Sequence, residues 1–264
     1  GDGNSTVGND LGSFIRDHLH GFAAVVLKGL PVNSSTQFSH LMHATGLDLQ
    51  DYIGGVTSRP LAAPKVTPAS AEPPEVSMES HCDNPYWARP PLRLVLFCKL
   101  PPRVGGQAFL TDGRAVLRQL WEEHPDIVKA LQSRQMRYYH FYPDADTFEG
   151  SGLVTWQESY AAGCNATQGC DLFSTAMEAL LRENHSFEWI PSGLRRWEVV
   201  PAIKAHPVTG EETWTNQLTA MHCSVFDNHP GFPELHRSET ARAEACRMHG
   251  SMPYHTTFGD GEEF

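Results

Sequence analysis

Residues 78–116 read MESHCDNPYWARPPLRLVLFCKLPPRVGGQAFLTDGRAV, and a histidine and an aspartate, His81 and Asp83, stand two positions apart near their start. On a β-strand, residues i and i+2 point to the same face, so this imidazole and this carboxylate can bind one divalent cation together. A third ligand from another strand would complete a two-histidine, one-carboxylate triad, which suits non-haem iron(II) and oxygen chemistry. The pair therefore predicts a metal site that depends on a second histidine.

A His-x-Asp pair alone is a weak signal, because the chain holds 14 histidines and 31 acidic residues and pairs of this kind arise by chance. A second pair, His124 and Asp126, stands in WEEHPDIVKAL, where Pro125 suits the first position of a helix. We interpret this second pair as a junction between two helices that holds no metal. The sequence around each pair must therefore decide which of the two pairs binds a metal.

The sequence after the first pair alternates apolar runs with turn residues. It predicts a strand at 92–97, a Pro-Pro and Gly-Gly turn, and a second strand at 107–111. Asp112 suits the N-cap of a helix that follows over 114–123.

These residues resemble the taurine dioxygenase and clavaminate synthase-like group of iron(II)/2-oxoglutarate-dependent oxygenases. Members carry His-x-Glu/Asp, then Tyr, Pro, an apolar strand with Phe and Cys, a Pro pair, Gly-Gly-x-Thr and Asp-x-Arg. Two later blocks also match in order and spacing, so the resemblance covers most of the chain: HPVTGE at 206–211, with Trp214 and Asn216-Gln217 after it, and FGDG at 258–261. The matching residues of the first block are His81, Asp83, Tyr86, Pro90, Phe97, Cys98, Pro101, Pro102, Gly105, Gly106, Asp112 and Arg114.

The resemblance implies an α+β fold, with a double-stranded β-helix (jelly-roll) core and flanking helices in one domain over residues 1–264. It implies iron(II) bound by His81, Asp83 and a second histidine, with 2-oxoglutarate as cosubstrate and O2 as oxidant. In the family that histidine lies well beyond the Gly-Asp-Gly block, so we expect it, and the last strands of the barrel, beyond Phe264.

The activity implied is hydroxylation, or another oxidation, of an unactivated C–H bond in a small amino-acid-like or carboxylate substrate. The carboxylate of Asp83 favours hydroxylation, since related halogenases lack it. Tyr86, Trp87 and Asn216 are candidates for lining the substrate pocket, and a role as packing aromatics and a polar turn residue is the alternative for these three.

Two positions depart from the family pattern. Ala108 replaces the threonine that helps to hold 2-oxoglutarate, and losing one hydrogen bond to a charged group costs roughly 1.5–3 kcal/mol. Thr111 is a poor substitute, because in a regular strand it would face the other side. The chain also begins with Gly1 and ends at Phe264, and we interpret it as a fragment that lacks the third metal ligand and the arginine that binds 2-oxoglutarate.

Other histidines within the chain are possible replacements for the expected one. His222 follows the Asn-Gln pair and is expected to face the pocket, whereas a histidine on the surface or in the core is the usual case. The other five are His206, His229, His236, His249 and His255.

Two other classes of function stay open. A non-catalytic relative that acts as a binding or scaffold domain is favoured by Ala108 and by the two family ligands that this chain does not contain. A zinc hydrolase is less favoured, because the chain has no His-Glu-x-x-His motif.

Composition excludes several partners. The net charge is −11 with no cluster of Lys or Arg, which argues against nucleic acid and anionic membranes, and no apolar run approaches the roughly 18 residues of a membrane span. We therefore expect a small-molecule substrate, while the sequence does not indicate an oligomeric state. The six cysteines form no Cys-x-x-Cys, which favours free thiols and a cytoplasmic protein, although disulfides stay possible. Four Asn-x-Ser/Thr sequons, short motifs that often match by chance, begin at Asn4, Asn33, Asn165 and Asn184.

Periodicity and turn residues predict the remaining elements. A proline-rich loop at 59–77 leads into the metal-binding segment, either as a surface connection or as a lid. Helices are expected at 8–20, 35–45, near 155–156, 172–183 and 237–248, and strands at 22–30, 134–141, 187–190, 194–205 and 212–216.

Overall fold

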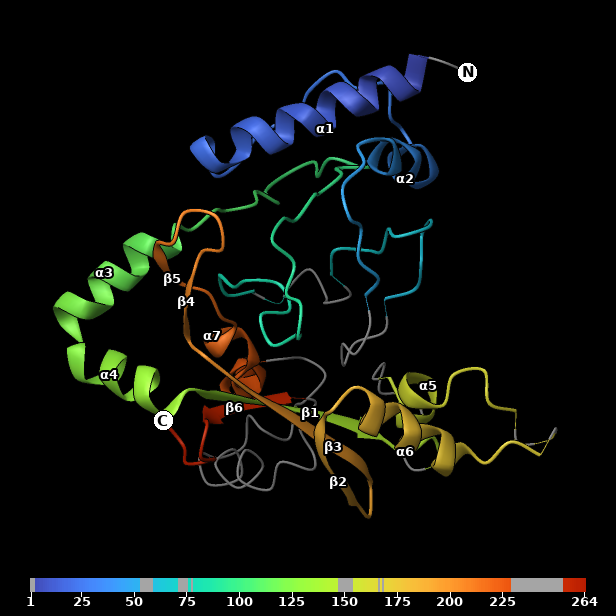
Figure 1. Ribbon diagram of the computed structural model, residues 1–264, viewed down its shortest axis with the longest axis vertical. Helices are drawn as coiled ribbons and strands as arrows, with labels where there is room; N and C mark the ends of the chain where they lie inside the picture. The colour runs from blue at the N-terminus through green and yellow to red at the C-terminus, as the bar shows by residue number, and fades with distance from the viewer. Residues whose placement is uncertain are drawn as a thin grey trace. The chain divides into compact units, whose positions relative to one another are not determined.

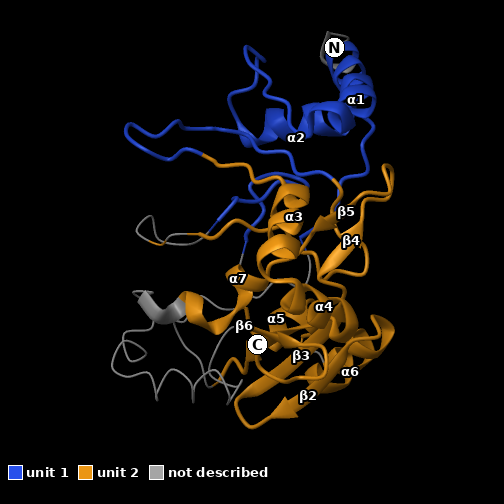
Figure 2. Ribbon diagram, turned by 90° about the vertical axis from the view of Figure 1, so that its left-hand side faces the viewer, with its two compact units in different colours: residues 1–53, 59–71, 93–107 blue, residues 54–58, 72–92, 108–264 orange. Residues whose placement is uncertain are grey.

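The computed structural model describes residues 3–52, 59–70, 76, 78–146, 154–165, 167, 169–228 and 254–264 (Figure 1). The chain forms two compact units (Figure 2): unit 1 comprises residues 1–53, 59–71 and 93–107, and unit 2 comprises residues 54–58, 72–92 and 108–264. The single domain expected from the sequence stays a prediction.

Unit 1 is built on two helices, α1 (Gly3–Phe22) and α2 (Ser35–Ala44). Their apolar faces form a core of Leu11, Ile15, Leu41 and Met42. The helices pack closely because Gly12 has no side chain: a Cβ there would lie 2.1 Å from the carbonyl oxygen of Thr45. Both helices confirm predictions, and Ser34 caps α2 by accepting a hydrogen bond from the backbone N–H of Gln37.

Three predicted strands are wrong. Residues 22–30, 92–97 and 107–111 form no strand, and apolar side chains within them are exposed, Val26 by 79% and Leu96 by 62%. An apolar run predicts an extended segment, but a strand also needs a neighbour for its backbone hydrogen bonds. Among the described residues no segment pairs with these three. The proline-rich loop is irregular where the structure describes it, apart from one bridge between Ala63 and Val66.

In unit 2 the helix predicted after the Gly-Gly turn is confirmed. The side chain of Asp112 accepts a hydrogen bond from the N–H of Arg114 and begins α3 (Gly113–Glu123). The next helix, α4 (Pro125–Arg134), has proline in its first turn, so the second His-x-Asp pair does lie at a helix junction. The other α-helices of unit 2 are α5 (Trp156–Tyr160), α6 (Leu172–Arg182) and α7 (Leu218–Met221), and a 3-10 helix, η2, spans Cys223–Asn228. The helix expected at 237–248 lies outside the described residues.

The described part of unit 2 also contains two antiparallel sheets and is therefore α+β. The larger has the order β2-β3-β1-β6, and the smaller pairs β4 with β5 (Figure 1). The single strand expected at 194–205 is divided because Pro201, which has no N–H to donate, follows the last residue of β3. The bounds are β1 (Met136–Pro143), β2 (Ser186–Ile190), β3 (Gly193–Val200), β4 (Ile203–Ala205), β5 (Glu212–Trp214) and β6 (Tyr254–Phe258).

One face of the larger sheet carries the core of unit 2. At one end, Tyr142 and Leu194 pack with side chains of α5 and α6. At the other end, Met136 and Tyr138 pack with Tyr86 and with residues from α4 and α7. The central strand β1 thus connects the segment that follows Asp83 to the rest of the unit.

The cysteines depart in part from the free-thiol expectation. Cys164 and Cys170 form a disulfide, and Cys223 is disulfide-bonded as well, whereas Cys82 and Cys98 are free. The prediction of free thiols is therefore wrong for these three cysteines, because the spacing of cysteines along a sequence does not reveal which of them the fold brings together. No helix in the described part of the chain is long and apolar enough to cross a membrane.

Candidate metal centre

The structure brings His81 and Asp83 together. Nε2 of His81 lies 3.5 Å from Oδ1 of Asp83, and both side chains are largely shielded, with 19% and 24% of their surface exposed. The segment that carries them is not a regular strand, but the N–H of Cys82 donates to the carbonyl oxygen of Asn216 over 3.1 Å. The two side chains therefore converge as the i, i+2 spacing predicts, although their role as metal ligands stays a prediction.

A backbone carbonyl sets the protonation of the His81 ring. Nδ1 lies 2.6 Å from the carbonyl oxygen of Glu79. Because a carbonyl oxygen only accepts, Nδ1 must carry the proton in this contact, and Nε2 of the neutral ring keeps its lone pair. A histidine whose distal N–H is bound to a carbonyl is the usual arrangement for a metal ligand. The nitrogen nearer Asp83 is thus the one able to bind a metal.

The residues after Asp83 anchor this segment. The Tyr86 ring is buried against the rings of His140 and Tyr138, with centroids 4.5 and 5.4 Å away. The ammonium group of Lys204 donates to the carbonyl oxygen of Pro85 over 2.5 Å, and burial lowers its pKa. Sequence reasoning missed Lys204, because nothing in a sequence indicates a contact with a backbone carbonyl.

Asn216 links three segments beside the pair. Its Nδ2 donates to the carbonyl oxygen of Ala202 and its Oδ1 accepts from the N–H of Leu218, both over 3.0 Å, while its own carbonyl accepts from Cys82. These contacts, like the packing of Tyr86, match the structural alternative for the proposed pocket residues. A substrate-binding role for Tyr86, Trp87 and Asn216 stays a prediction.

Thr111, near the position where Ala108 departs from the family pattern, has an unexpected neighbour. Ala108 is exposed in an irregular segment, whereas Oγ1 of Thr111 lies 3.0 Å from Oγ of Ser80, the residue before His81. Because residues 107–111 form no strand, strand alternation does not place Thr111 on the opposite side.

A second group of metal-binding residue types lies elsewhere in unit 2. Ligand atoms of His222, Cys223 and His255 lie within 4.8 Å of one another, and among the described residues this is the one group of three. It does not fit a metal. Cys223 is disulfide-bonded, and Nδ1 of His255 accepts from the N–H of Cys223 while Nε2 lies 3.1 Å from Glu263. Both ring nitrogens of His255 are therefore engaged.

Among the described residues, no histidine forms such a group of three with His81 and Asp83. His206 begins the β4–β5 hairpin, where its Nδ1 accepts from the N–H groups of Val208 and Thr209. His229, His236 and His249 lie outside the described residues. In the second His-x-Asp pair, the side chain of Asp126 is 98% exposed and faces Lys129 at 3.8 Å.

Behind Tyr86 lies a buried network of charges. Nε of Arg196 is 2.9 Å from Oε1 of Glu198, and the other carboxylate oxygen is 3.4 Å from Nδ1 of His140. His185 also reaches Glu198, with its Nδ1 at 3.1 Å. Burial acts to raise the pKa of Glu198, but the charge of Arg196 and the contacts with the two histidines outweigh it and hold this pKa well below its usual range. Burial in turn lowers the pKa of His140.

Comparisons with known proteins agree with the resemblance noted in the sequence. A family model described as taurine catabolism dioxygenase TauD, TfdA family, matches residues 2–263. A clavaminate synthase-like protein of Arabidopsis thaliana is 24% identical over 79% of this chain. The dapdiamide synthesis protein DdaC of Enterobacter agglomerans is 23% identical over 91% of it. The matched regions cover 62% and 65% of the length of these two relatives.

Proposed function

This chain belongs to the TauD, TfdA family of dioxygenases, and we propose that it is an iron(II)- and 2-oxoglutarate-dependent oxygenase of a small organic substrate. The observation that carries the proposal is the convergence of Nε2 of His81 and Oδ1 of Asp83, 3.5 Å apart. The family is one of oxidoreductases that use iron, 2-oxoglutarate and O2.

The donor set fits iron(II). A neutral imidazole nitrogen and a carboxylate are two of the three protein ligands in a facial triad, and we propose a second histidine as the third. With 2-oxoglutarate and O2, bound iron supplies the oxidation of an unactivated C–H bond, while 2-oxoglutarate becomes succinate and CO2. We further propose that the larger antiparallel sheet forms part of a jelly-roll core, the fold that the family implies.

The chain's own residues prepare the site. The Glu79 carbonyl favours the tautomer with the proton on Nδ1 of His81, which places the lone pair of a neutral ring on Nε2. The Cys82 thiol is held protonated, since burial raises its pKa, and a thiol is a poor metal ligand. The hydrogen bonds from Lys204 to Pro85 and from Cys82 to Asn216 hold the backbone on both sides of Asp83.

The names of the two relatives support a class of substrate. The two relatives are named for clavaminate synthase and for dapdiamide synthesis, which favours oxidation of a small amino-acid-like or carboxylate compound. The carboxylate at position 83 favours hydroxylation over halogenation.

The test is the turnover of 2-oxoglutarate. With iron(II) and O2, the full-length protein is expected to form succinate slowly even without its substrate. Asp83→Ala is expected to lower that rate by about 100-fold or more, because loss of a residue that only hydrogen-bonds to a metal ligand already costs 10–100-fold. Asp126→Ala removes the acid of the other His-x-Asp pair and should leave the rate unchanged. Equal rates in the folded Asp83→Ala variant and the wild type would refute the proposal.

A further inference from the structure

The sequons are the motifs that the proposed oxygenase function does not explain. Four of the eight asparagines begin an Asn-x-Ser/Thr motif. Serine and threonine together account for 35 of 264 residues, so about one sequon is expected by chance. Asn33, Asn165 and Asn184, the three of these asparagines whose burial the structure describes, are all exposed. The excess of sequons over the chance expectation and the exposure of these three asparagines favour a function for the motifs.

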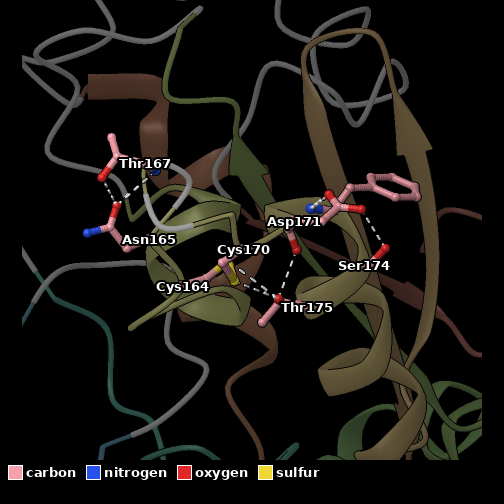
Figure 3. The surroundings of a disulfide bond; sticks show 8 residues. Cys164, Asn165, Thr167, Cys170, Asp171, Ser174 and Thr175 are labelled. Carbon is pink, nitrogen blue, oxygen red and sulfur yellow. Dashed lines mark hydrogen bonds between the residues drawn. A yellow bond between two sulfur atoms is a disulfide. The ribbon is translucent and has the colours of Figure 1, made fainter.

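One sequon lies inside a loop closed by a disulfide. The bond between Cys164 and Cys170, with Cα atoms 5.5 Å apart, spans the motif that begins at Asn165 (Figure 3). Each end of the loop is attached to a helix. The N–H of Cys164 donates to the carbonyl of Ala161 at the end of α5, and Asp171, next to Cys170, caps α6 by accepting from the N–H of Phe173. The two ends of the loop are thus fixed on unit 2.

The side chains of the motif are arranged for modification. Oδ1 of Asn165 accepts from the backbone N–H of Thr167 over 3.0 Å and from its hydroxyl over 2.7 Å. The amide nitrogen of Asn165 consequently lies on the side away from Thr167 (Figure 3). The side chains of Asn165 and Thr167 are both exposed, so the motif is accessible from solvent.

We propose that Asn165 is an N-glycosylation site. In this reaction Nδ2 of Asn165 attacks the anomeric carbon of an oligosaccharide carried on a polyisoprenyl pyrophosphate. A C–N bond forms, the C–O bond to the pyrophosphate breaks, and the amide loses one proton as the lipid pyrophosphate leaves. No electrons are exchanged, and the motif supplies the acceptor amide and the threonine hydroxyl that recognition requires.

The disulfides support the compartment that this chemistry needs. Disulfides persist in oxidising compartments and are rare in the cytosol, where thiols are kept reduced. Exposed disulfides are the easier ones to reduce, and the Cys164–Cys170 loop lies at the surface. The disulfide bond of Cys223 also favours an oxidising compartment. N-glycosylation also takes place in the secretory compartments, so the two observations imply one location, which differs from the cytoplasm expected from the cysteine spacing.

Mass spectrometry of the protein isolated from its source cells tests the site. Digestion with peptide N-glycosidase in H2(18)O converts a glycosylated asparagine to 18O-labelled aspartate, and we expect this label at Asn165, in a peptide that contains the Cys164–Cys170 disulfide before reduction. Unmodified Asn165 in the isolated protein overturns the proposal, as does a glycan found at Asn33 or Asn184 alone.

Matched variants distinguish the effect of losing the motif from the effect of misfolding. Expressed in the same cells, Thr167→Ser should keep the glycan, whereas Thr167→Ala and Asn165→Gln should lose it and gain gel mobility. Circular dichroism of the three variants should be alike, because the changed side chains are exposed. Persistence of the label at position 165 in Thr167→Ala would show modification by other chemistry and overturn the proposal. The outcome does not depend on iron or 2-oxoglutarate, so it stands or falls apart from the oxygenase function.

Discussion

Replacing His81 with alanine is expected to weaken iron(II) binding by more than about 100-fold, since removing only a residue that hydrogen-bonds to a metal ligand costs 10–100-fold. Nε2 of His81 lies 3.5 Å from Oδ1 of Asp83, so alanine removes one of the two proposed protein ligands in this chain. Anaerobic calorimetric titration of the full-length protein with iron(II) measures the change in Kd.

The matched control for this experiment is His124→Ala. It removes the histidine of the second His-x-Asp pair, whose aspartate is fully open to solvent beside Lys129. Its Kd should equal that of the wild type. A folded His81→Ala variant with unchanged affinity, or an equal loss in both variants, would contradict a site at His81.

Replacing Glu198 with glutamine is expected to lower the free energy of unfolding by about 3–5 kcal/mol, the usual cost of breaking a buried ion pair. Arg196 is only 2% exposed, and its Nε lies 2.9 Å from the carboxylate that the substitution removes. The variant would leave the guanidinium buried without its counter-charge. Chemical denaturation followed by circular dichroism measures the difference.

Two further variants identify the cause of that loss. The double variant Arg196→Met with Glu198→Leu should be less destabilised than Glu198→Gln, because an apolar pair leaves no unpaired charge in the core. Asp126→Asn, which breaks an exposed ion pair of α4, should leave stability unchanged. If the double variant were destabilised as much as Glu198→Gln or more, the charge explanation would be wrong.

The destabilisation caused by Glu198→Gln should also depend on pH in a defined direction. The pKa of Glu198 is lower in the folded protein than the roughly 4.3 of an unfolded glutamate, so its contribution is complete above that value and declines as the pH falls below it. Glutamine does not titrate. The stability gap between the wild type and Glu198→Gln should therefore narrow as the pH falls below about 4.3.

Local chemistry in the sequence predicted much of the fold. Asp112 was recognised as a helix cap because a short polar side chain satisfies the free N–H groups of the first turn. The helices at 8–20 and 172–183 were recognised from their apolar periodicity. These features depend on neighbours in the sequence, and so they can be read from it.

Features that depend on residues far apart along the chain were not predicted correctly from the sequence. The apolar runs at 22–30 and 92–97 look like strands, but a strand exists only with a neighbour to pair with, and no described segment fills that place. The disulfide between Cys164 and Cys170 and the contact of Lys204 with Pro85 likewise follow from the folded backbone.

The candidate site was predicted in the same partial way. The spacing of His81 and Asp83 predicted that their side chains converge, because two residues along an extended backbone return to one face. The Glu79 carbonyl that sets the His81 proton was not predicted, since every residue has a carbonyl and only the fold selects one. The exposed position of Ala108 and the contact of Thr111 with Ser80 depended on a strand that did not form.

The most direct measurement is an anomalous difference map, recorded at the iron edge, from crystals of the full-length protein grown anaerobically with iron(II). The proposed site predicts one peak at about 2.0–2.2 Å from both Nε2 of His81 and a carboxylate oxygen of Asp83, the range of nitrogen and oxygen ligands to first-row metals such as zinc. A peak at His222 and His255 instead, or no peak beside His81 in crystals that contain iron, would contradict it.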